Sequence, residues 1–180
     1  MGRFQARQEQ GCNRRNRSGT RKMNAAWDNF ETDFLNPNSW EQRRDGFPSD
    51  LLDALSPEEK AKAEEILFNR LDGSDDWPIR AMGHLRVARS VVRLRELLGS
   101  KMPTIRATAA TAIYRITGDA DMEAIVADIA GDTSLEWMFR LDAVICLSEF
   151  QTDSAQKVLS NLESDPQYLI AYNAKRMRRN

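Results

Sequence analysis

Residues 103–131 read PTIRATAATAIYRITGDADMEAIVADIAG, and this stretch decides the fold of the chain. Pro103 suits the first turn of a helix because proline lacks the amide hydrogen that a helix start leaves unpaired. Behind it, apolar side chains recur every three or four residues up to Gly118, a typical helix stop: Ile105, Ala109, Ala112, Ile113 and Ile116. Asp121 begins a second apolar helix that ends at Gly131. The stretch therefore predicts two helices joined by a tight turn.

The same helix pair recurs further along the chain. Ile105-Arg106-Ala107 returns 34 residues later as Phe139-Arg140-Leu141, and beyond the turn the offset is 33 residues. The apolar positions align in pairs: Ala109 with Ala143, Ile113 with Leu147, Ile116 with Phe150, Ile125 with Val158, Val126 with Leu159 and Ile129 with Leu162. A weaker copy, Ile79-Arg80-Ala81, lies 26 residues upstream. Because one helix pair cannot bury its apolar stripe alone, repeats of this kind stack and share a core.

Helical signals continue on both sides of the repeat, over residues 56–180. Ser56-Pro57-Glu58-Glu59 is a capping box, and the helix behind it is expected to end near Gly73. The other expected helices begin near Trp77, cover 87–98, begin at Ser134, cover 155–162 and begin at Pro166. No stretch favours a strand. The predicted fold class is all-α, a short right-handed α-solenoid (an α-α superhelix) of about three to four helix pairs.

The pattern is a helix with Pro, then Val or Ile, then Arg near its start, followed by a small-residue face, a Gly-Asp turn and a second apolar helix, as at residues 103–131. Over residues 56–174 this pattern resembles the bacterial HEAT-like repeats first named from phycobilin lyases. The resemblance implies an armadillo-like stack and leaves the function open. It also implies that turn aspartates pair with the repeated arginines: Arg80 with Asp75 or Asp76 and Arg140 with Asp132, whereas the turn before Arg106 has no acid.

The first 22 residues have a different composition. They carry seven basic residues against Glu9 alone, and Phe4 is their single large apolar side chain. Such a segment cannot offset the entropy lost on ordering, so we expect a disordered basic tail. Three interpretations stay open: a dispensable extension from a start codon assigned upstream of Met23, a real flexible tail, and an arm that grips nucleic acid.

Residues 23–55 form an aromatic and acidic arm. Trp27, Phe30 and Phe34 have the spacing of one helical face, and acidic residues lie between them. Exposed aromatic clusters are costly in a monomer. We therefore expect the arm to dock on the first helices, with folding onto a partner as the alternative.

The bulk properties exclude several classes of protein. The 180 residues have a net charge of −1, but residues 23–174 hold 15 basic against 26 acidic groups, so an acidic body has basic ends. No apolar run is long enough for a membrane span or a secretory signal. Cys12 and Cys146 form neither a disulfide framework nor a ligand cluster. We expect a cytoplasmic monomer.

The sequence contains no recognisable catalytic site. His84 is the single histidine and lacks companions for a metal site or a nucleophile to activate. Cys146 lies on a small-residue helix face, which is typical of a core position. The glycines are spread out and form no phosphate-binding loop. We therefore expect no enzyme activity, no metal and no cofactor.

Two enzyme classes remain as alternatives through the fold resemblance. Some alkylpurine DNA glycosylases are built from HEAT-like repeats and use aromatic and acidic side chains in a concave cleft; here such a set would draw on Trp77, Trp137, Asp132 and Asp142. A lyase-type HEAT protein is the other alternative, and beyond the repeat itself no residue supports it.

Charged stripes point to a binding surface. Arg86, Arg89 and Arg93 have the spacing of one helical face, and the next second helix carries Asp121, Glu123 and Asp128. Second helices of such pairs usually line the concave face, which would then be positive at one end and negative at the other. A polyanion would be repelled along half of it, whereas a protein of mixed charge would fit. The prediction is a protein-binding adaptor or scaffold; nucleic-acid binding and ordinary solvated faces are the alternatives.

Overall fold

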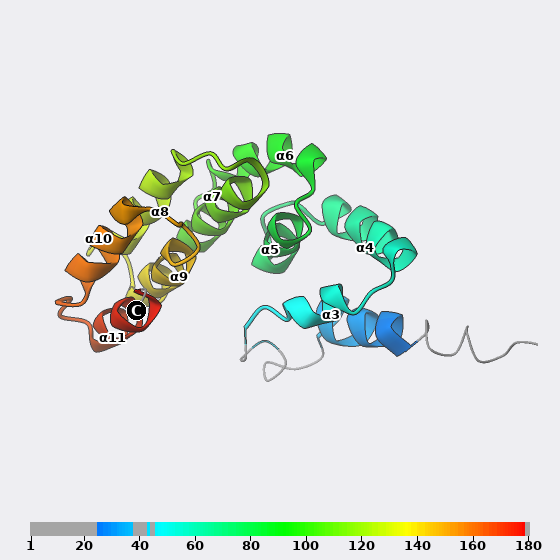
Figure 1. The fold of residues 1–180 in the computed structure, drawn as a ribbon, viewed down its shortest axis with the longest axis horizontal. Helices are drawn as coiled ribbons and strands as arrows, with labels where there is room; N and C mark the ends of the chain where they lie inside the picture. Colours follow the sequence, from blue (N-terminus) through cyan, green and yellow to red (C-terminus); the bar gives the residue numbers. More distant parts are fainter. Residues whose placement is uncertain (1–24, 38–42, 44–45, 179–180) are drawn as a thin grey trace, which may run out of the picture.

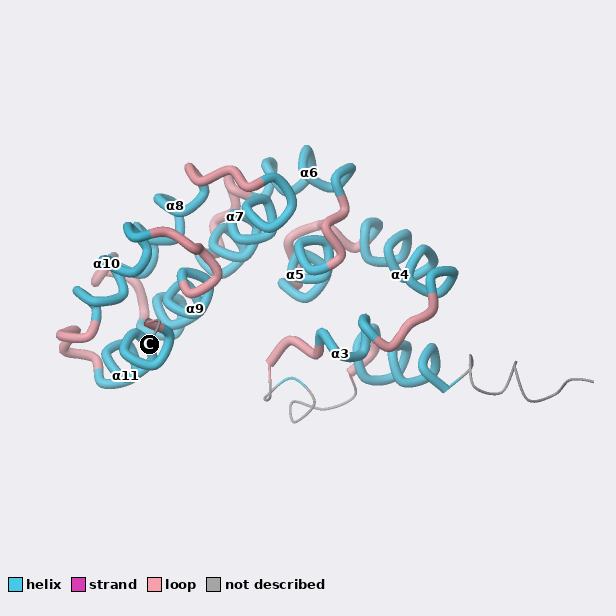
Figure 2. Tube along the Cα trace, in the orientation of Figure 1, coloured by secondary structure: helices cyan, strands magenta, loops and turns pink. Residues whose placement is uncertain are grey.

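The computed structural model describes residues 25–37, 43 and 46–178 (Figure 1). In this part of the chain every regular element is a helix and no strand is present, which confirms the all-α prediction (Figure 2). Residues 25–29 are helical and lead into η1, a π-helix. The elements follow in this order: η1 (Phe30–Leu35), α3 (Ser49–Asp53), α4 (Pro57–Asn69), α5 (Asp76–His84), η2 (Ala88–Ser90), α6 (Val91–Leu97), α7 (Pro103–Thr117), α8 (Met122–Gly131), α9 (Trp137–Leu147), α10 (Asp153–Leu162) and α11 (Tyr168–Met177).

From α5 onward the helices lie in two layers along an arc (Figure 1). α5, α7, α9 and α11 form the inner layer, and each packs against the next. α6, α8 and α10 form the outer layer: α6 packs on α7, α8 lies between α7 and α9, and α10 packs on α8, α9 and α11. Neighbouring helix pairs thus share one hydrophobic core, which extends from Phe30 to Ala174. None of the described helices is long and apolar enough to cross a lipid bilayer.

Small residues let the inner helices approach closely. Ala107, Ala109, Ala110 and Ala112 of α7 are at most 2% exposed. Gly83 of α5 faces this surface, and a Cβ atom on it would lie 2.8 Å from the Cα of Ala112. The contact between α5 and α7 therefore depends on glycine, because any side chain there meets backbone.

A polar turn precedes each inner helix. In each turn a side-chain oxygen accepts a hydrogen bond from the backbone amide two residues later: Asp72 from Ser74 (2.9 Å), Ser100 from Met102 (3.2 Å), Asp132 from Ser134 (3.0 Å) and Asp165 from Gln167 (2.8 Å). Asp and Ser favour such turns because their short side chains mimic a backbone turn. The turn is a structural repeat that the sequence comparison did not identify.

Arg140 holds two successive units together. It is 5% exposed, and its Nε donates to the carbonyl of Ala130 at 3.0 Å. Its guanidinium forms an ion pair with Asp165, in the turn before α11. The predicted pairing with Asp132 is wrong, because the side chain extends toward the next turn along the chain and not back to the preceding one.

Arg80 is placed differently from Arg140. Its Nε lies 2.6 Å from Oδ2 of Asp76, which confirms one of the two predicted partners. Asp75 instead pairs with Arg43, with a shortest N–O distance of 2.6 Å. Arg106 makes no ion pair within the described residues, in keeping with the acid-free turn before it. The three repeated arginines therefore have three different environments.

The aromatic arm docks on the first helices, as expected for residues 23–55. Phe30 is fully buried and Phe34 is 3% exposed. The Phe34 ring lies 5.3 Å from the ring of Trp77 in α5, measured between centroids. Arg70 of α4 donates from Nη1 to the carbonyl of Leu35 at 2.8 Å. The prediction of a disordered basic tail over residues 1–22 lies outside the described residues.

The expected helix over 87–98 is divided in two. A 3-10 turn, η2, precedes α6, and Arg86 before it has a positive φ of 52°. The hydroxyl of Ser90 donates to the carbonyl of Val87 at 2.7 Å, which satisfies the tight turn. As a result, the arginines before and after this turn do not lie along one regular helix.

Candidate functional site

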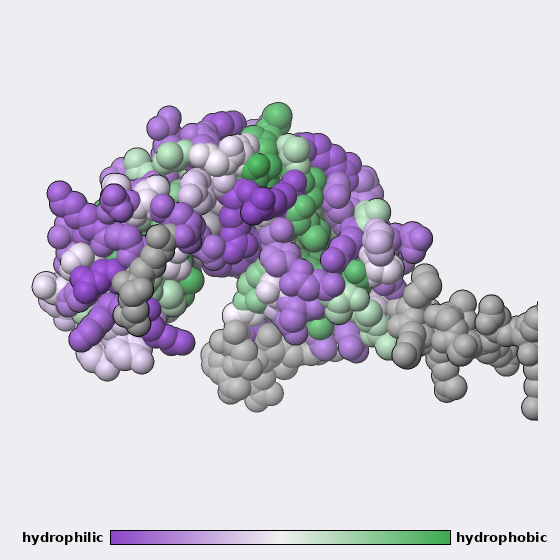
Figure 3. Space-filling model, in the orientation of Figure 1, coloured by the Kyte–Doolittle hydropathy of each residue, from purple (hydrophilic) through white to green (hydrophobic). Residues whose placement is uncertain are grey.

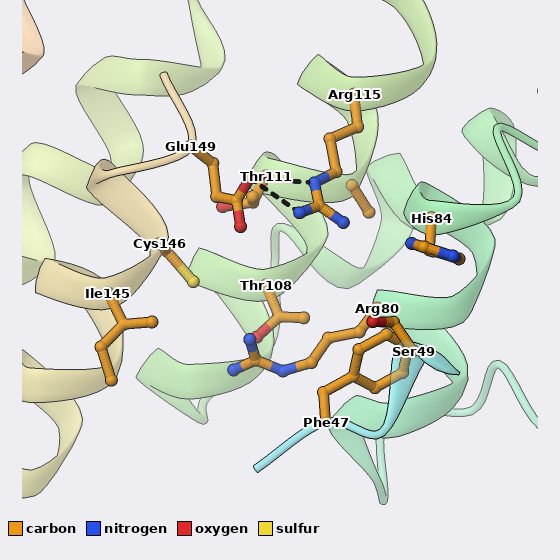
Figure 4. A pocket seen from close by; sticks show the side chains of 11 residues that line it. Phe47, Ser49, Arg80, His84, Thr108, Thr111, Arg115, Ile145, Cys146 and Glu149 are labelled. Atoms are coloured by element: carbon orange, nitrogen blue, oxygen red, sulfur yellow. Dashed lines mark hydrogen bonds and ion pairs between the residues drawn. The ribbon is translucent and has the colours of Figure 1, made fainter. Parts of the chain in front are cut away.

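The inner faces of α5, α7 and α9 enclose a cavity of about 300 Å³. It lies on the concave side of the arc, where the space-filling view shows a hollow with a mainly hydrophilic surface (Figure 3). Its lining comes from the arm and from three inner helices: Phe47, Ser49, Arg80, His84, Thr108, Thr111, Ala112, Arg115, Ile145, Cys146 and Glu149 (Figure 4). We call this cavity and its lining the groove.

Helical spacing explains why polar side chains gather in the groove. On α7, Thr104, Thr108, Thr111 and Arg115 are three or four residues apart and so lie along one face of a helix that is otherwise rich in alanine. On α5, residues 76, 80 and 84 form the corresponding row. α5 and α7 therefore turn their polar rows toward the concave side and their apolar residues toward the core.

Arg80 extends along the floor of the groove toward Thr108 (Figure 4). Its Nε is engaged by Asp76, but within the described chain neither Nη1 nor Nη2 makes a hydrogen bond. Burial by itself would lower the pKa of Arg80, yet the opposite charges around it, including those of Asp76 and Asp142, raise the pKa overall. Arg80 is thus a fixed cation with unused donors.

Two further charged pairs border the groove. Arg115 contacts Oε2 of Glu149 through Nη2 at 2.7 Å and through Nε at 3.2 Å. His84 places Nε2 2.8 Å from Oδ1 of Asp53, and its ring is 6.2 Å from that of Phe47. Arg115 and Glu149 bring both signs of charge to the rim, so the groove does not present a field of one sign.

Asp142 of α9 is not among the residues that line the groove, but its charge acts on Arg80. Its Oδ2 accepts a hydrogen bond from the hydroxyl of Thr104 at 2.7 Å. Burial raises the pKa of Asp142, and the nearby charge of Asp76 adds to the effect, while the Thr104 bond and Arg80 oppose it. The carboxylate is therefore held in a site that disfavours its charge.

The hydroxyl of Thr108 has no hydrogen-bond partner among the residues that the structure describes. The residue is 2% exposed, and its Oγ1 is buried at the wall of the cavity. Thr111, on the same face, behaves as threonines in helices usually do and donates to the carbonyl of Ala107 at 2.9 Å. Because buried polar groups are almost always paired, the unpartnered Thr108 is the most unusual feature of the groove.

Cys146 closes the groove between α7 and α9. It is 2% exposed and belongs to the core, which confirms its interpretation from the sequence. Burial raises the pKa of the thiol above its ordinary value. A protonated, buried thiol is a poor nucleophile, so Cys146 contributes shape to the cavity and not reactivity.

The arginines predicted to bind a partner lie outside the groove. Arg89 bridges two acids of α4, Glu64 at 2.9 Å and Glu65 at 2.6 Å, and stacks over the Phe68 ring at 4.5 Å. Arg93 lies 5.9 Å from the centroid of the same ring. Arg86 lines a second hollow next to the groove. Arg89 and Arg93 therefore stabilise the contact between α4 and the α6 region.

The predicted acidic residues are also separate from the groove. Glu123 is 7% exposed and accepts a hydrogen bond from the hydroxyl of Thr152, the N-cap of α10. Asp121 and Asp128 are exposed on α8, in the outer layer. The expectation that second helices line the concave face is wrong here: the arginine-bearing helices α5, α7 and α9 are the inner ones.

Trp77 and Asp132, two residues of the alternative glycosylase set, have structural roles. Trp77 is 5% exposed, packed against Phe34 and covered by Arg43 at 4.5 Å. Asp132 holds the turn before α9. Neither lines the cavity. Among the described residues no group of His, Cys, Asp and Glu side chains is arranged to hold a metal ion.

The polar groove residues that the sequence analysis missed are Ser49, Thr108, Thr111, Arg115 and Glu149. The available signal was the polar row on α7, which interrupts an alanine-rich helix at regular intervals. No protein-family model, curated protein sequence or solved structure matches the chain. A functional inference therefore rests on the geometry of the groove.

Proposed function

We propose that this chain is a HEAT-like α-solenoid, of about three to four helix pairs, that binds another protein in the groove and carries out no catalysis. The observation that carries the proposal is the convergence of polar side chains from three successive inner helices on one concave cavity. Stacked helix pairs commonly use such concave surfaces for recognition. The recurring turns and the repeat at residues 103–131 support the solenoid assignment.

The charge pattern favours a protein over a nucleic acid as the partner. Arg80 and Arg115 are each paired with a carboxylate, and the charge of Asp142 also acts on Arg80. A phosphate backbone would meet these acids wherever it met the arginines, whereas a protein surface of mixed charge can match both signs. In this proposal Arg89 and Arg93, which the sequence singled out, have a structural role.

A pair of double variants tests the proposal. Arg115→Ala with Glu149→Ala removes an ion pair in the groove, and Arg95→Ala with Asp119→Ala removes a pair of similar length, 2.8 Å, elsewhere on the surface. Neither double variant changes the net charge. Full-length wild type and both variants are used as baits in quantitative affinity capture from a lysate of the source organism.

The groove variant is expected to lose a specific partner by about tenfold or more, while the control retains it. Purified partner and a direct binding measurement then confirm the difference. Equal recovery of every captured protein by the two variants contradicts binding in the groove. Capture of nucleic acid that falls steeply with added salt, and equally in both variants, would support the nucleic-acid alternative instead.

A further inference from the structure

The unpartnered hydroxyl of Thr108 implies a missing hydrogen-bond partner. A buried hydroxyl without a partner destabilises a protein, so its retention at the wall of a cavity calls for an explanation. The neighbouring Thr111 shows that a backbone carbonyl can satisfy a threonine on the same helix face. Thr108 instead keeps its donor and acceptor capacity for something that enters the groove.

Unused guanidinium donors of Arg80 lie beside the Thr108 hydroxyl. Nη1 and Nη2 of Arg80 make no hydrogen bond within the described chain, and the guanidinium points toward Thr108 in the close-up view (Figure 4). Since Asp76 engages only Nε, the planar fork of Arg80 can still donate two parallel hydrogen bonds. A carboxylate matches this fork and accepts both bonds.

We infer that the floor of the groove binds a carboxylate group of the partner protein, held by the Arg80 guanidinium and the Thr108 hydroxyl as donors. This inference rests on the proposed function and specifies what the groove recognises. The cavity of about 300 Å³ admits one side chain or a chain end. Phe47, Ala112 and Ile145 supply apolar surface for the carbon atoms next to the carboxylate.

Charge balance favours a carboxylate over a phosphate. Asp76 and Asp142 already act on Arg80, Glu149 pairs with Arg115, and burial raises the pKa of Asp142, so additional negative charge is disfavoured there. A single negative charge is therefore easier to accommodate than a phosphate dianion. The carboxylate belongs either to an acidic side chain or to the C-terminus of the partner.

Small probes test the inference without the partner protein. N-acetyl-alanine carries a terminal carboxylate, N-acetyl-glutamate α-amide a side-chain carboxylate, and N-acetyl-alanine amide none; inorganic phosphate is the fourth probe. Each is titrated into the full-length chain while the Arg80 Nε–H and the Thr108 methyl are followed by NMR. One of the two carboxylates is expected to shift both signals in a saturable way, and the stronger of the two identifies the source.

Thr108→Val and Thr111→Val form a matched pair of variants. Both replace a cavity-lining hydroxyl by a methyl group of the same shape, but only the hydroxyl of Thr108 lacks a partner. Thr108→Val is expected to weaken carboxylate binding about fivefold to tenfold and to raise the thermal unfolding midpoint. Thr111→Val is expected to keep the affinity within about twofold and not to raise the midpoint. Arg80→Gln is expected to weaken binding by about tenfold or more.

The inference is overturned if neither carboxylate binds at about 20 mM, which would be weaker than any useful contact. It is also overturned if the amide or phosphate binds as well as the better carboxylate, or if the two threonine variants behave alike. Failure here together with partner loss in the Arg115/Glu149 variant would leave the proposed function intact. Saturable carboxylate binding with no groove-dependent partner would instead contradict the proposed function alone.

Discussion

Arg80 and Arg140 come from matching stretches of sequence and do different work. The side chain of Arg140 is 6% exposed and that of its partner Asp165 is 5% exposed, so this ion pair is enclosed between two units. Arg80 is 25% exposed, contacts an acid one turn away on its own helix, and keeps two nitrogens directed into the groove. An arginine that follows Ile or Phe at matching positions therefore forms a buried ion pair between units in one case and a partly exposed hydrogen-bond donor in the other. What differs is the direction in which each helix turns that position.

Removal of the buried ion pair between Arg140 and Asp165 should have the largest effect on stability. Arg140→Met leaves Asp165 buried without its counter-ion, so we expect a loss of about 3–5 kcal/mol in the free energy of unfolding. Arg80→Met should cost less than half as much, because Asp76 at 24% side-chain exposure can be hydrated. Urea denaturation followed by circular dichroism measures both. Equal losses in the two variants would show that the two arginines are not different in kind.

The exposed pair of Arg95 and Asp119 calibrates this measurement. Its side chains are 49% and 26% exposed, and the shortest N–O distance is 2.8 Å. Arg95→Ala should change the free energy of unfolding by less than about 1 kcal/mol, because water screens such pairs.

An intermediate effect is expected where α5 meets α7. Gly83→Ala places a Cβ atom 2.8 Å from the Cα of Ala112 and 3.0 Å from its Cβ, so the helices must separate. We expect a loss of about 1–3 kcal/mol. Gly131→Ala is the control, since a Cβ there meets nothing within 4 Å and alanine favours a helix by up to about 1 kcal/mol. If both substitutions stabilise the protein, the close approach of α5 and α7 is not real.

The smallest effect is the pH dependence of folding stability that Asp142, whose charge acts on Arg80, contributes. Burial raises the pKa of this carboxyl in the folded chain, so the folded state holds a proton that the unfolded state has already released. Stability from this group is therefore present at low pH and lost as the pH rises through its folded pKa. Asp142→Asn should reduce the fall in the free energy of unfolding as the pH rises above about 4, and should raise that free energy at neutral pH. Thermal midpoints across that range check it, and an unchanged slope would argue against a buried carboxylate.

The helices could be predicted from the sequence because their signals are local. The capping box at Ser56 is present, and the Glu59 carboxylate accepts a hydrogen bond from the Ser56 amide at 2.9 Å. Gly118 ends α7 with a φ of 75°, as its position after the apolar run predicts. The division of 87–98 was missed, because the turn depends on a side-chain hydrogen bond from Ser90 that periodicity does not register.

The groove could not be predicted, because it depends on which helix of each pair faces inward. Periodicity within a helix is a property of neighbouring residues, so by itself the sequence determined an all-helical chain, its repeated pairs and its buried faces. The inner position of α5, α7 and α9, and with it the meeting of Arg80 and Thr108, arises only when the pairs stack. Stacking is decided by contacts between residues far apart in the chain, such as Gly83 on Ala112 and Arg140 on Asp165, and no local pattern encodes them.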